Sequence, residues 1–577
     1  MASLKGNNTC SSSIPDRSLN LWDDDFVQSM ETPYEGSEYH ERVETLVNEV
    51  KMLLKEMQTQ DCSLIERLEM VDALQCFGID RYFKAEIKEI LDYVYRCWDE
   101  SVGLGLQCES ITKNLNATAL GLRLLRLHRY DVSGDVLENF KDKNGQFFFS
   151  GENKDDDENK NEEHVMRSML NLLRSSSVAF TGETIMEEAK LFSSAYLKQI
   201  IEKPGDTYRK SFVKEVEYAL LYEWSRTFSR WEARNFIEIY ELDILRLKDK
   251  KILELAKLNF NILQFTYKTE MKKLSSWWTD SRVSKSIAGR QRTIEYLLLA
   301  VSIADEVDFS SSRIAVAKTS VIITILDDLF DDYLTLEQIE LITKSIVQGW
   351  DISLIQNLPK NFKAAIEFCF KTVHELASDA TKKQGRDMMQ FITKTWTDYI
   401  EGNLQQARWN KSGYVPTYNE YIRIAATTAA IGPISLHAIL LAAPVAEDNV
   451  IEKIFHNQSR FYELIWLCTR LVDDIHDFED DKLHGQTSSA ISSYMKDHPE
   501  FSEDGALNHI NGLLNQFIKE LTWEFLNPNN NLLDWEGLSF NINRGMQCFY
   551  VFGHGFSYHD KGVKERIFKV LIDPVKI

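Results

Sequence analysis

Two groups of aspartates carry the clearest chemistry in this 577-residue chain, and each follows an apolar run. The first group lies in VIITILDDLFDDY, residues 321–333, and contains Asp327 and Asp331. Four-residue spacing puts these two carboxylates on one face of a helix, with Asp328 about a quarter-turn away. Like charges at this spacing repel each other and destabilise a helix, so a bound cation is a natural compensation.

The second group lies in YELIWLCTRLVDDIHDFEDDKLHG, residues 462–485. Asp473, Asp477 and Asp481 again follow four-residue spacing, and Arg470 comes one turn earlier. Oxygen ligands without a nearby Cys or His pair suit Mg²⁺ better than zinc, and Mg²⁺ commonly shares its shell with phosphate oxygens. One acidic run alone is more often a solvated helix face, but two with the same spacing favour a diphosphate held between metal ions.

The elements that position these groups are predicted to be helices. In residues 41–58 the apolar side chains recur every three or four residues: Val43, Leu46, Val47, Val50, Leu53 and Leu54. Similar spacing continues nearly to the C-terminus and alternating patterns are scarce, so we expect an all-α fold. A charged seam, ELDILRLKDKK at residues 241–251, and the chain length predict two helical domains, residues 1–245 and 246–577.

Composition narrows the partners and the compartment. Lys plus Arg number 66 and Asp plus Glu number 88, a net charge of −22 that disfavours nucleic acid and anionic membranes. Eight scattered cysteines without a CxxC pair suggest reduced thiols. No apolar run reaches about twenty residues and the N-terminus lacks an apolar signal core, so we expect a cytoplasmic protein, with a plastid transit peptide less favoured.

The two motifs also carry a family resemblance. DDLFD, residues 327–331, resembles the DDxxD motif of class I terpene synthases, and DDIHDFEDD, residues 473–481, falls where that family has its second metal motif, (N,D)Dxx(S,T)xxxE. The resemblance extends from about residue 22 to the C-terminus and is closest to conifer sesquiterpene synthases of the gamma-humulene and delta-selinene type. Four further segments look like plant terpene synthases: LQCFGIDRYFKAEI (74–87), LNATALGLRLLRLHRYDVS (115–133), RWEARNFIEIY (230–240) and LAKLNFNILQ (255–264).

The resemblance implies a C-terminal domain that holds the active site and a catalytically silent N-terminal helical domain whose first segment caps that site. It implies three Mg²⁺ ions, with Mn²⁺ as the substitute, that ionise a prenyl diphosphate. The implied metal ligands are Asp327, Asp328, Asp331, Asp473, Asp477 and Asp481. Arg290 and Arg292 in GRQRTIEY match the family's RxR motif, and Arg470 matches the arginine before the second motif; guanidinium groups suit phosphate oxygens.

The carbocation that remains needs an apolar, aromatic pocket, because π-faces stabilise positive charge without acting as nucleophiles. The pocket candidates are Phe330, Trp466, Phe549 and Tyr550. ATTAAIG, residues 426–432, resembles the family's broken helix, which assigns Thr427 and Thr428 to the break.

Several positions depart from the family pattern. In the second motif, Asp477 stands where Ser or Thr is usual, and Asp481 stands where Glu is usual. Leu299 stands where many relatives have an aromatic pocket residue. His554 stands where the C-terminal segment usually has Asp. Leu334 replaces a common Gly, which we interpret as a packing change. A lone Arg17 stands where many monoterpene synthases have a tandem arginine. The sequence contains no DxDD motif, so we do not expect cyclisation that begins with protonation.

The leading hypothesis is therefore a monomeric sesquiterpene synthase that cyclises farnesyl diphosphate. A diterpene synthase acting on geranylgeranyl diphosphate is the first alternative. Prenyl chain elongation also uses paired aspartate motifs, but the long N-terminal domain argues against it. A non-catalytic helical interaction protein on the same fold is the alternative of a different class, and the intact aspartates and arginines argue against it.

Overall fold

The computed structural model describes residues 22–577 except positions 32, 60–61, 106–112, 148–157, 203–207, 286, 288, 443–444, 446–450, 453–458, 484–485, 531–533 and 553–560. In this part of the chain helices form almost all of the regular structure, and the β structure is limited to the isolated bridges Asp99–Gly103 and Lys141–Phe147. The all-α prediction is confirmed. His554 lies outside the described residues.

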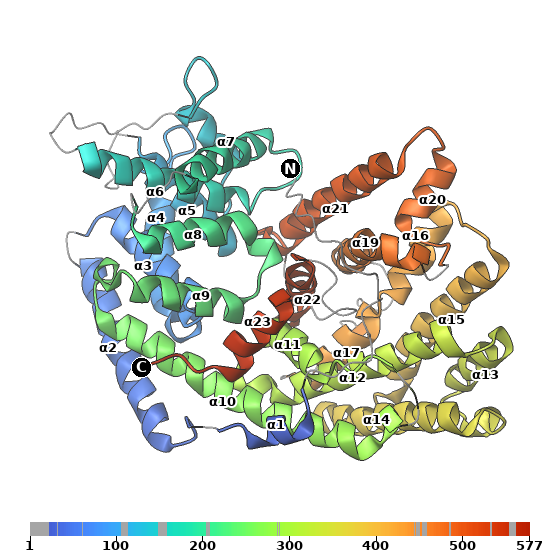
Figure 1. Cartoon of the computed structure of the whole chain (residues 1–577). Coiled ribbons are helices and arrows are strands. Elements are labelled where there is room, and N and C mark those ends of the chain that lie inside the picture. The colour runs from blue at the N-terminus through green and yellow to red at the C-terminus, as the bar shows by residue number, and fades with distance from the viewer. Residues whose placement is uncertain are drawn as a thin grey trace.

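Most helices of the N-terminal half lie together in Figure 1, whereas the first, residues 24–29, lies apart from them. Its α-helices are α1 (Asp24–Ser29), α2 (Ser37–Thr59), α3 (Leu64–Cys76), α4 (Lys84–Arg96), α5 (Leu115–Leu127), α6 (Glu158–Ser176), α7 (Thr184–Ile201), α8 (Lys210–Leu221) and α9 (Ser229–Glu241). Short 3₁₀ turns connect them: η1 (Asp80–Phe83), η2 (Gly134–Phe140), η3 (Trp224–Arg226) and η4 (Ile244–Arg246). The predicted boundary at residue 245 falls in η4 and stays a prediction.

The C-terminal half begins with α10, the longest helix. Its α-helices are α10 (Lys250–Ser281), α11 (Thr293–Ile303), α12 (Ser310–Asp328), α13 (Leu336–Val347), α14 (Lys360–Gln384), α15 (Met389–Ser412), α16 (Tyr418–Thr428), α17 (Ile431–Leu441), α19 (Arg460–Leu483), α20 (Ala490–Asp497), α21 (Glu503–Leu526), α22 (Asp534–Phe549) and α23 (Lys561–Ile567). The short turns are η5 (Val283–Lys285), η6 (Val307–Phe309), η7 (Leu329–Tyr333), η8 (Ile352–Ile355) and η9 (Phe568–Ile572). Of these, η7 and η9 are π-helical.

Both ends of the described chain pack on α10. Helices α1 and α2 lie against it, and Figure 1 shows the red C-terminal segment returning to the same region. Asn261 on α10 donates to the carbonyl of Val575 at 2.8 Å and accepts from its backbone N–H at 2.8 Å. Because segments more than 300 residues apart meet on one helix, α10 joins the two halves of the molecule.

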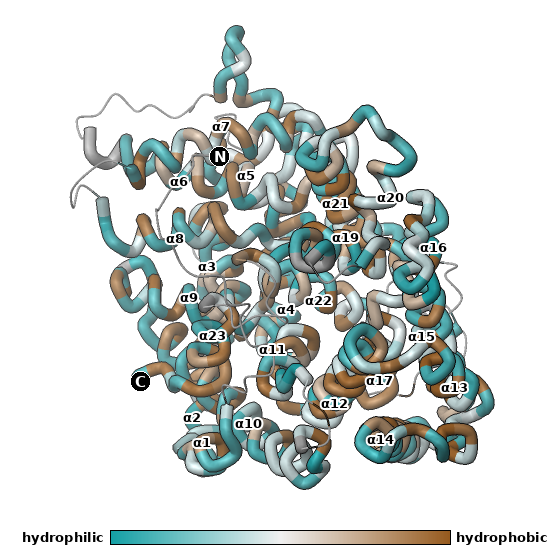
Figure 2. Tube along the Cα trace, turned by 45° about the vertical axis from the view of Figure 1, so that its right-hand side comes forward, coloured by the Kyte–Doolittle hydropathy of each residue, from teal (hydrophilic) through white to brown (hydrophobic). Residues whose placement is uncertain are grey.

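The centre of the C-terminal half is apolar. Every residue of α11 and of α17 is buried, and Figure 2 shows α12 and α17 largely brown where they meet. Among the described residues one helical stretch, Tyr418–Leu441, is long and apolar enough to cross a membrane, and 83% of its most apolar window is buried inside the protein. This stretch comprises α16 and α17, which separate at Ala430, and it forms core here.

The cysteines differ in one place from the expectation. Cys62, Cys76, Cys369, Cys468 and Cys548 are free. Cys97 is disulfide-bonded, and its partner lies outside the described residues. The expectation of reduced thiols throughout the chain therefore does not hold at Cys97.

Candidate active site

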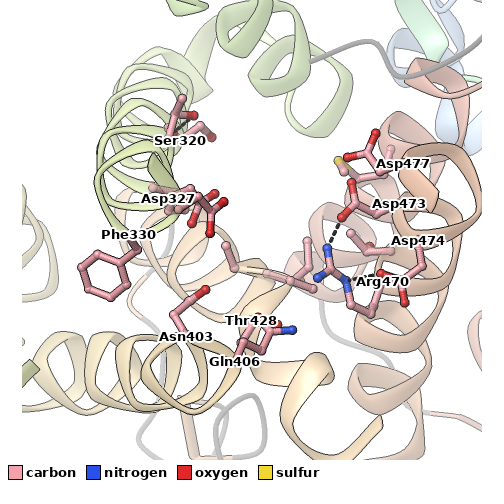
Figure 3. A pocket seen from close by; sticks show the side chains of 18 of the residues that line it. Ser320, Asp327, Phe330, Asn403, Gln406, Thr428, Arg470, Asp473, Asp474 and Asp477 are labelled. Carbon is pink, nitrogen blue, oxygen red and sulfur yellow. Dashed lines mark hydrogen bonds and ion pairs between the residues drawn. The ribbon is translucent and has the colours of Figure 1, made fainter. Parts of the chain in front are cut away.

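A cavity of about 230 Å³ opens between α12 and α19, with α15 and the α16–α17 junction below it (Figure 3). Its lining includes residues from both acidic motifs and from six other segments of the C-terminal half. Figure 3 shows Asp327 on one side and Asp473 and Asp477 on the other. The two acidic motifs, about 140 residues apart in sequence, therefore face each other across one space.

The first motif lies where α12 changes into the π-helical turn η7. Asp327 belongs to the last turn of α12, and Asp331 belongs to η7. The Tyr399 hydroxyl on α15 donates to Asp327 at 2.6 Å. A π turn inside a helix is rare and is common at functional sites. Here it adjusts the direction of Asp331 relative to Asp327.

Both carboxylates resist ionisation. Burial raises the pKa of Asp327 to about 6, although the charge of Arg290 opposes this. Asp331 is exposed to the cavity, yet the surrounding protein excludes enough water to raise its pKa to about 7, and the negative charge of Asp327 adds to this shift. A divalent cation between them would stabilise the ionised forms.

Asp328 faces away from this pair. Its carboxylate accepts from the backbone N–H of Arg290 at 2.7 Å and from Arg290 Nε at 2.7 Å. A Cβ at Gly289 would lie 2.8 Å from the same carboxylate, so glycine permits the close approach. Asp328 does not line the cavity, whereas Arg290 does. The structure therefore places Asp328 as an anchor of Arg290, and its role as a metal ligand stays a prediction.

The second arginine of the RxR motif lies deeper. Arg292 is 1% exposed and does not line the cavity. It interacts electrostatically with Glu295, one turn into α11. Glu295 in turn accepts a hydrogen bond from the Trp22 indole at 3.2 Å. The first described residue of the chain is thus connected to the motif that the family resemblance assigns to diphosphate binding.

The opposite wall is the second motif on α19. Arg470 forms a close ion pair with Asp473, and its Nε lies 3.4 Å from Asp474. Asp474 also accepts from the Tyr421 hydroxyl, at 2.7 and 2.9 Å, and from the backbone N–H of Ala490 at 2.7 Å. Asp474 therefore holds Arg470 in place from below, although burial raises its own pKa to about 6.

The remaining predicted ligands of this wall are partly described. Asp477 lines the cavity. Asp481 lies in the last turn of α19, where the side chain is outside the described part of the structure. Asp473 also accepts a close hydrogen bond from the Tyr550 hydroxyl.

The two walls contact each other at one point. Gln486 follows α19, and its side-chain amide donates to Asp331 at 3.4 Å. Asn410 on α15 accepts from the backbone N–H of Thr487 at 3.2 Å, so the segment after α19 is tied to α15 as well.

Carboxylate oxygens on facing walls suit ions that are shared with a ligand. Among the residues that the structure describes, no three Asp, Glu, His or Cys side chains meet closely enough to hold one ion on their own. Mg²⁺ usually binds through one or two carboxylates and completes its shell with water and phosphate oxygens. The donor set of the cavity therefore fits Mg²⁺ that arrives with a diphosphate.

The junction between α16 and α17 forms the floor below Arg470. Ala430 has φ 59°, in the left-handed region, and Pro433 has no N–H to offer the carbonyl of Ala429. The Thr427 hydroxyl donates to the carbonyl of Ile424 at 2.7 Å, and the Thr428 hydroxyl donates to that of Ala425 at 3.1 Å. The predicted helix break is therefore present, and its threonine hydroxyls are bonded within α16.

The predicted pocket residues divide into two groups. Leu299, Phe330 and Tyr550 line the cavity, although Figure 3 shows the Phe330 ring directed away from the opening. Trp466 and Phe549 are buried but do not line it.

Sequence reasoning missed several polar and aromatic lining residues. They are Tyr296, Ser320, Thr324, Asn403, Gln406, Asn410, Tyr421, Asp474 and Gln486. Helical spacing from known motif residues could have found Tyr296, four residues after Arg292. Nothing local indicates the residues of α15.

Comparisons with known proteins agree with this geometry. Residues 21–220 match the family described as terpene synthase, N-terminal domain, and residues 279–520 match the terpene synthase family, metal binding domain. The delta-selinene-like synthase, chloroplastic, of Picea sitchensis is 44% identical over 98% of this chain and 99% of its own length. The alpha-humulene synthase of Picea glauca has the same identity and coverage.

A solved structure shows the same architecture. Isoprene synthase from grey poplar leaves (Populus x canescens), in complex with three Mg²⁺ ions and dimethylallyl-S-thiolodiphosphate, has a TM-score of 0.81 and 27% identity, covering 96% of this chain and 99% of that one. The chain belongs to the plant terpene synthase family. It is a class I terpene synthase, a lyase that acts on prenyl diphosphates through a metal-binding domain.

Proposed function

We propose that the protein ionises farnesyl diphosphate and cyclises the resulting cation to sesquiterpene hydrocarbons. The observation that supports this most is the lining of the cavity, which combines facing carboxylates and two anchored arginines with apolar residues. The apolar lining consists of Leu299, Ile323, Ile434 and Met546 together with the backbone of the helix break. A charged head group and a hydrocarbon tail each find a matching part of this space.

Each charged group has a defined part in this proposal. Asp327 and Asp331 on one wall and Asp473 and Asp477 on the other hold three Mg²⁺ ions, with Asp481 completing the second set. Bound Mg²⁺ neutralises the diphosphate and makes it a better leaving group. Arg470 orients toward the departing diphosphate because Asp473 and Asp474 hold its guanidinium.

Arg290 acts from the first wall. Asp328 fixes both its backbone and its side chain, so the guanidinium is oriented before substrate arrives. Preoriented cationic groups stabilise charge that develops on the leaving group without reorganising. Arg292 and Trp22 support this loop from behind.

The choice of the fifteen-carbon substrate draws on the relatives. The two at 44% identity over nearly the whole chain are named for a selinene-like and a humulene synthase. Geranylgeranyl diphosphate is the alternative substrate.

The direct test is incubation of purified protein with Mg²⁺ and, separately, geranyl, farnesyl and geranylgeranyl diphosphate, followed by gas chromatography and mass spectrometry. We expect fifteen-carbon hydrocarbons to dominate and EDTA to abolish them. Twenty-carbon products alone would replace the sesquiterpene proposal with the diterpene alternative. Diphosphate release from none of the three would support a non-catalytic protein on this fold.

We further propose a monomer in the cytoplasm. The net charge of −22 disfavours nucleic acid and anionic membrane as partners. The word chloroplastic in the name of the Picea sitchensis relative and the disulfide at Cys97 point the other way for the compartment. Fusion of residues 1–30 to a fluorescent protein in leaf cells tests this: fluorescence in chloroplasts would contradict the cytoplasmic proposal. Light scattering of the pure protein tests the monomer.

A further inference from the structure

We propose that Gly402 on α15 determines which products the enzyme makes, because it sets the position of the helix break in the cavity wall. The proposal rests on the carbocation chemistry of the family and adds a specificity-determining residue outside the cavity lining.

Gly402 is buried where α15 crosses the end of α16. A Cβ built on Gly402 would lie 2.6 Å from Thr427 Oγ1 and 2.8 Å from Thr428 Cγ2. Both distances are shorter than real Cβ contacts, so any other residue at position 402 must displace the two threonine side chains or shift one of the helices. Glycine thus allows α15 and the break to approach closely.

The other side of the break is packed against the same helix. A Cβ on Gly432, at the start of α17, would lie 3.1 Å from Thr395 Cγ2 on α15. Thr395 and Gly402 are seven residues apart and share one face of α15. Gly402 and Gly432 therefore allow α15 to pack closely on both sides of the helix break.

The same face of α15 also reaches the first acidic motif. Tyr399 lies between Thr395 and Gly402, and its hydroxyl donates to Asp327 at 2.6 Å. Gln406, one helical turn after Gly402, and Thr428 both line the cavity, and Figure 3 shows them below the opening. The distance between the helix break and the carboxylates that face the diphosphate is therefore set through α15.

The break itself has little freedom to absorb a displacement. Thr427 Oγ1 donates to the carbonyl of Ile424, so moving it costs a hydrogen bond, and Ala430 already has a left-handed backbone. Residues 428–431 line the cavity directly. A side chain at position 402 must then shift this wall inward or move Tyr399 outward with α15.

Small shifts of this wall are enough to change products. Branches of a carbocation cascade whose barriers differ by about 1.4 kcal/mol already give tenfold product ratios. Ionisation depends on the groups that bind the metal ions and the diphosphate, and none of them is replaced at position 402. A change at position 402 should consequently alter product ratios more than it alters substrate consumption.

The test is Gly402→Ala, assayed with whichever prenyl diphosphate the wild-type enzyme accepts. We expect the ratio of the two most abundant products to change about threefold or more, while KM stays within about threefold of wild type, because no group that contacts the metal ions or the diphosphate is itself replaced. The matched control is Gly512→Ala on α21, where a Cβ would meet nothing within 4 Å. An unchanged product profile in active Gly402→Ala enzyme would overturn the proposal.

A second comparison identifies the contact responsible and covers the case in which Gly402→Ala folds poorly. Thr427→Ala with Thr428→Ser removes both atoms that the new Cβ would meet. In that background, adding Gly402→Ala should leave the products unchanged, because the space is now available. Equal product shifts in both backgrounds would show that position 402 acts by another route. Since the accepted substrate is established on wild-type enzyme first, a failure of the farnesyl diphosphate proposal does not affect this result.

Discussion

Each half of the molecule contains a buried cluster of charges beside a cavity, and the two clusters are balanced in opposite ways. In the N-terminal half Arg174 donates to Asp72 at 2.6 and 3.0 Å, and Arg123 donates to the same carboxylate. Glu215 accepts from Arg167 at 2.6 Å and from Arg246 at 2.7 Å. Each carboxylate of this pair is met by two guanidinium groups.

The pKa values reflect this balance. Burial alone would raise the pKa of Glu215, but the charges of Arg167 and Arg246 lower it to about 2. Arginine neighbours also hold the pKa of Asp72 below its usual range against the effect of burial. In the active site the pKa values of Asp327 and Asp331 rise instead, because burial is not offset.

The comparison shows that charge balance identifies the functional cavity better than size does. The cavity beside Asp72 and Glu215 has a volume of about 370 Å³ and is comparable in size to the active-site cavity. Its ionic cluster is nearly complete without a ligand, whereas the active-site carboxylates gain their counter-charge from what binds. The predictions below change one cluster at a time.

The largest expected effect is on catalysis. Asp327→Ala should reduce Mg²⁺-dependent diphosphate release by about 10²–10³-fold, the loss typical of removing a group that stabilises transition-state charge. The Tm should not fall, because the substitution removes a carboxylate whose burial is not offset by cations. Diphosphate release and thermal unfolding measure the two quantities.

The neighbouring Asp332 provides the control for this variant. It is exposed, lies in the adjoining turn η7 and does not line the cavity. Asp332→Ala should therefore keep nearly full activity. Equal losses of diphosphate release in both variants would contradict the assignment of Asp327 as a metal ligand.

The second effect is on stability. Asp72→Ala leaves Arg123 and Arg174 buried without their partner, and breaking such a pair typically costs about 3–5 kcal/mol of unfolding free energy. The product profile of the folded enzyme should not change, because the cluster lies in the other half. Urea unfolding and product analysis at low temperature test both statements.

An exposed ion pair gives the matched control. Lys371 and Glu375 lie 3.8 Å apart on the surface of α14, and Glu375→Ala should cost at most about 1 kcal/mol. If Asp72→Ala lowered the free energy of unfolding by no more than Glu375→Ala does, the buried N-terminal ion pairs would not stabilise the fold as we infer.

The sequence predicted the architecture and the two acidic walls for local reasons. Helical periodicity is repeated along the chain, and four-residue spacing places Asp473 and Asp477 on one side of α19. The π-helical turn at Asp331 was not predicted, because its formation depends on packing around η7. Asp328 shows the same limit: its motif position suggests a metal ligand, but the fold brings Arg290 to it from 38 residues away.

Residues that reach the site through packing could not be found from spacing. Tyr399 approaches Asp327 across 72 residues, and Tyr421 approaches Asp474 across 53. Trp466 shows the reverse error, since an aromatic on an apolar helix can face any of several neighbours, and this one packs in the core near Gly432.

The third prediction concerns acid. The folded pKa of Glu215 is lowered from its ordinary value near 4.5 to about 2, so its contribution to stability is complete above pH 4.5 and is lost as the pH falls toward 2. A shift of this size corresponds to about 3 kcal/mol. Glu215→Gln should be less stable than wild type near neutral pH, and the difference should shrink in acid.

Urea unfolding of both proteins at several pH values between 3 and 6 measures this difference. The slope is the informative quantity, because Gln also leaves the two arginines without a counter-charge at every pH. Parallel curves would show that Glu215 does not titrate below its ordinary range, and the N-terminal cluster would then resemble the active site more than we infer.

The smallest effect is expected at Glu295, whose environment is intermediate between the two clusters. Burial raises its pKa, the charge of Arg292 opposes this, and the Trp22 indole supplies one hydrogen bond. Trp22→Phe keeps an aromatic ring and removes that donor, which should cost about 1 kcal/mol of stability.

If Glu295 positions Arg292, the same change should also weaken inhibition by inorganic diphosphate about twofold to fivefold. This inhibition measures how well the arginines hold the leaving group. Trp98→Phe removes an exposed indole–carboxylate bond, 3.0 Å to Glu100, in the N-terminal half, and should leave inhibition unchanged. If Trp22→Phe lost stability but kept the same inhibition by diphosphate, the prediction would be contradicted. Glu295 would then resemble the N-terminal cluster, because an interaction that only stabilises the fold has no reason to alter diphosphate binding.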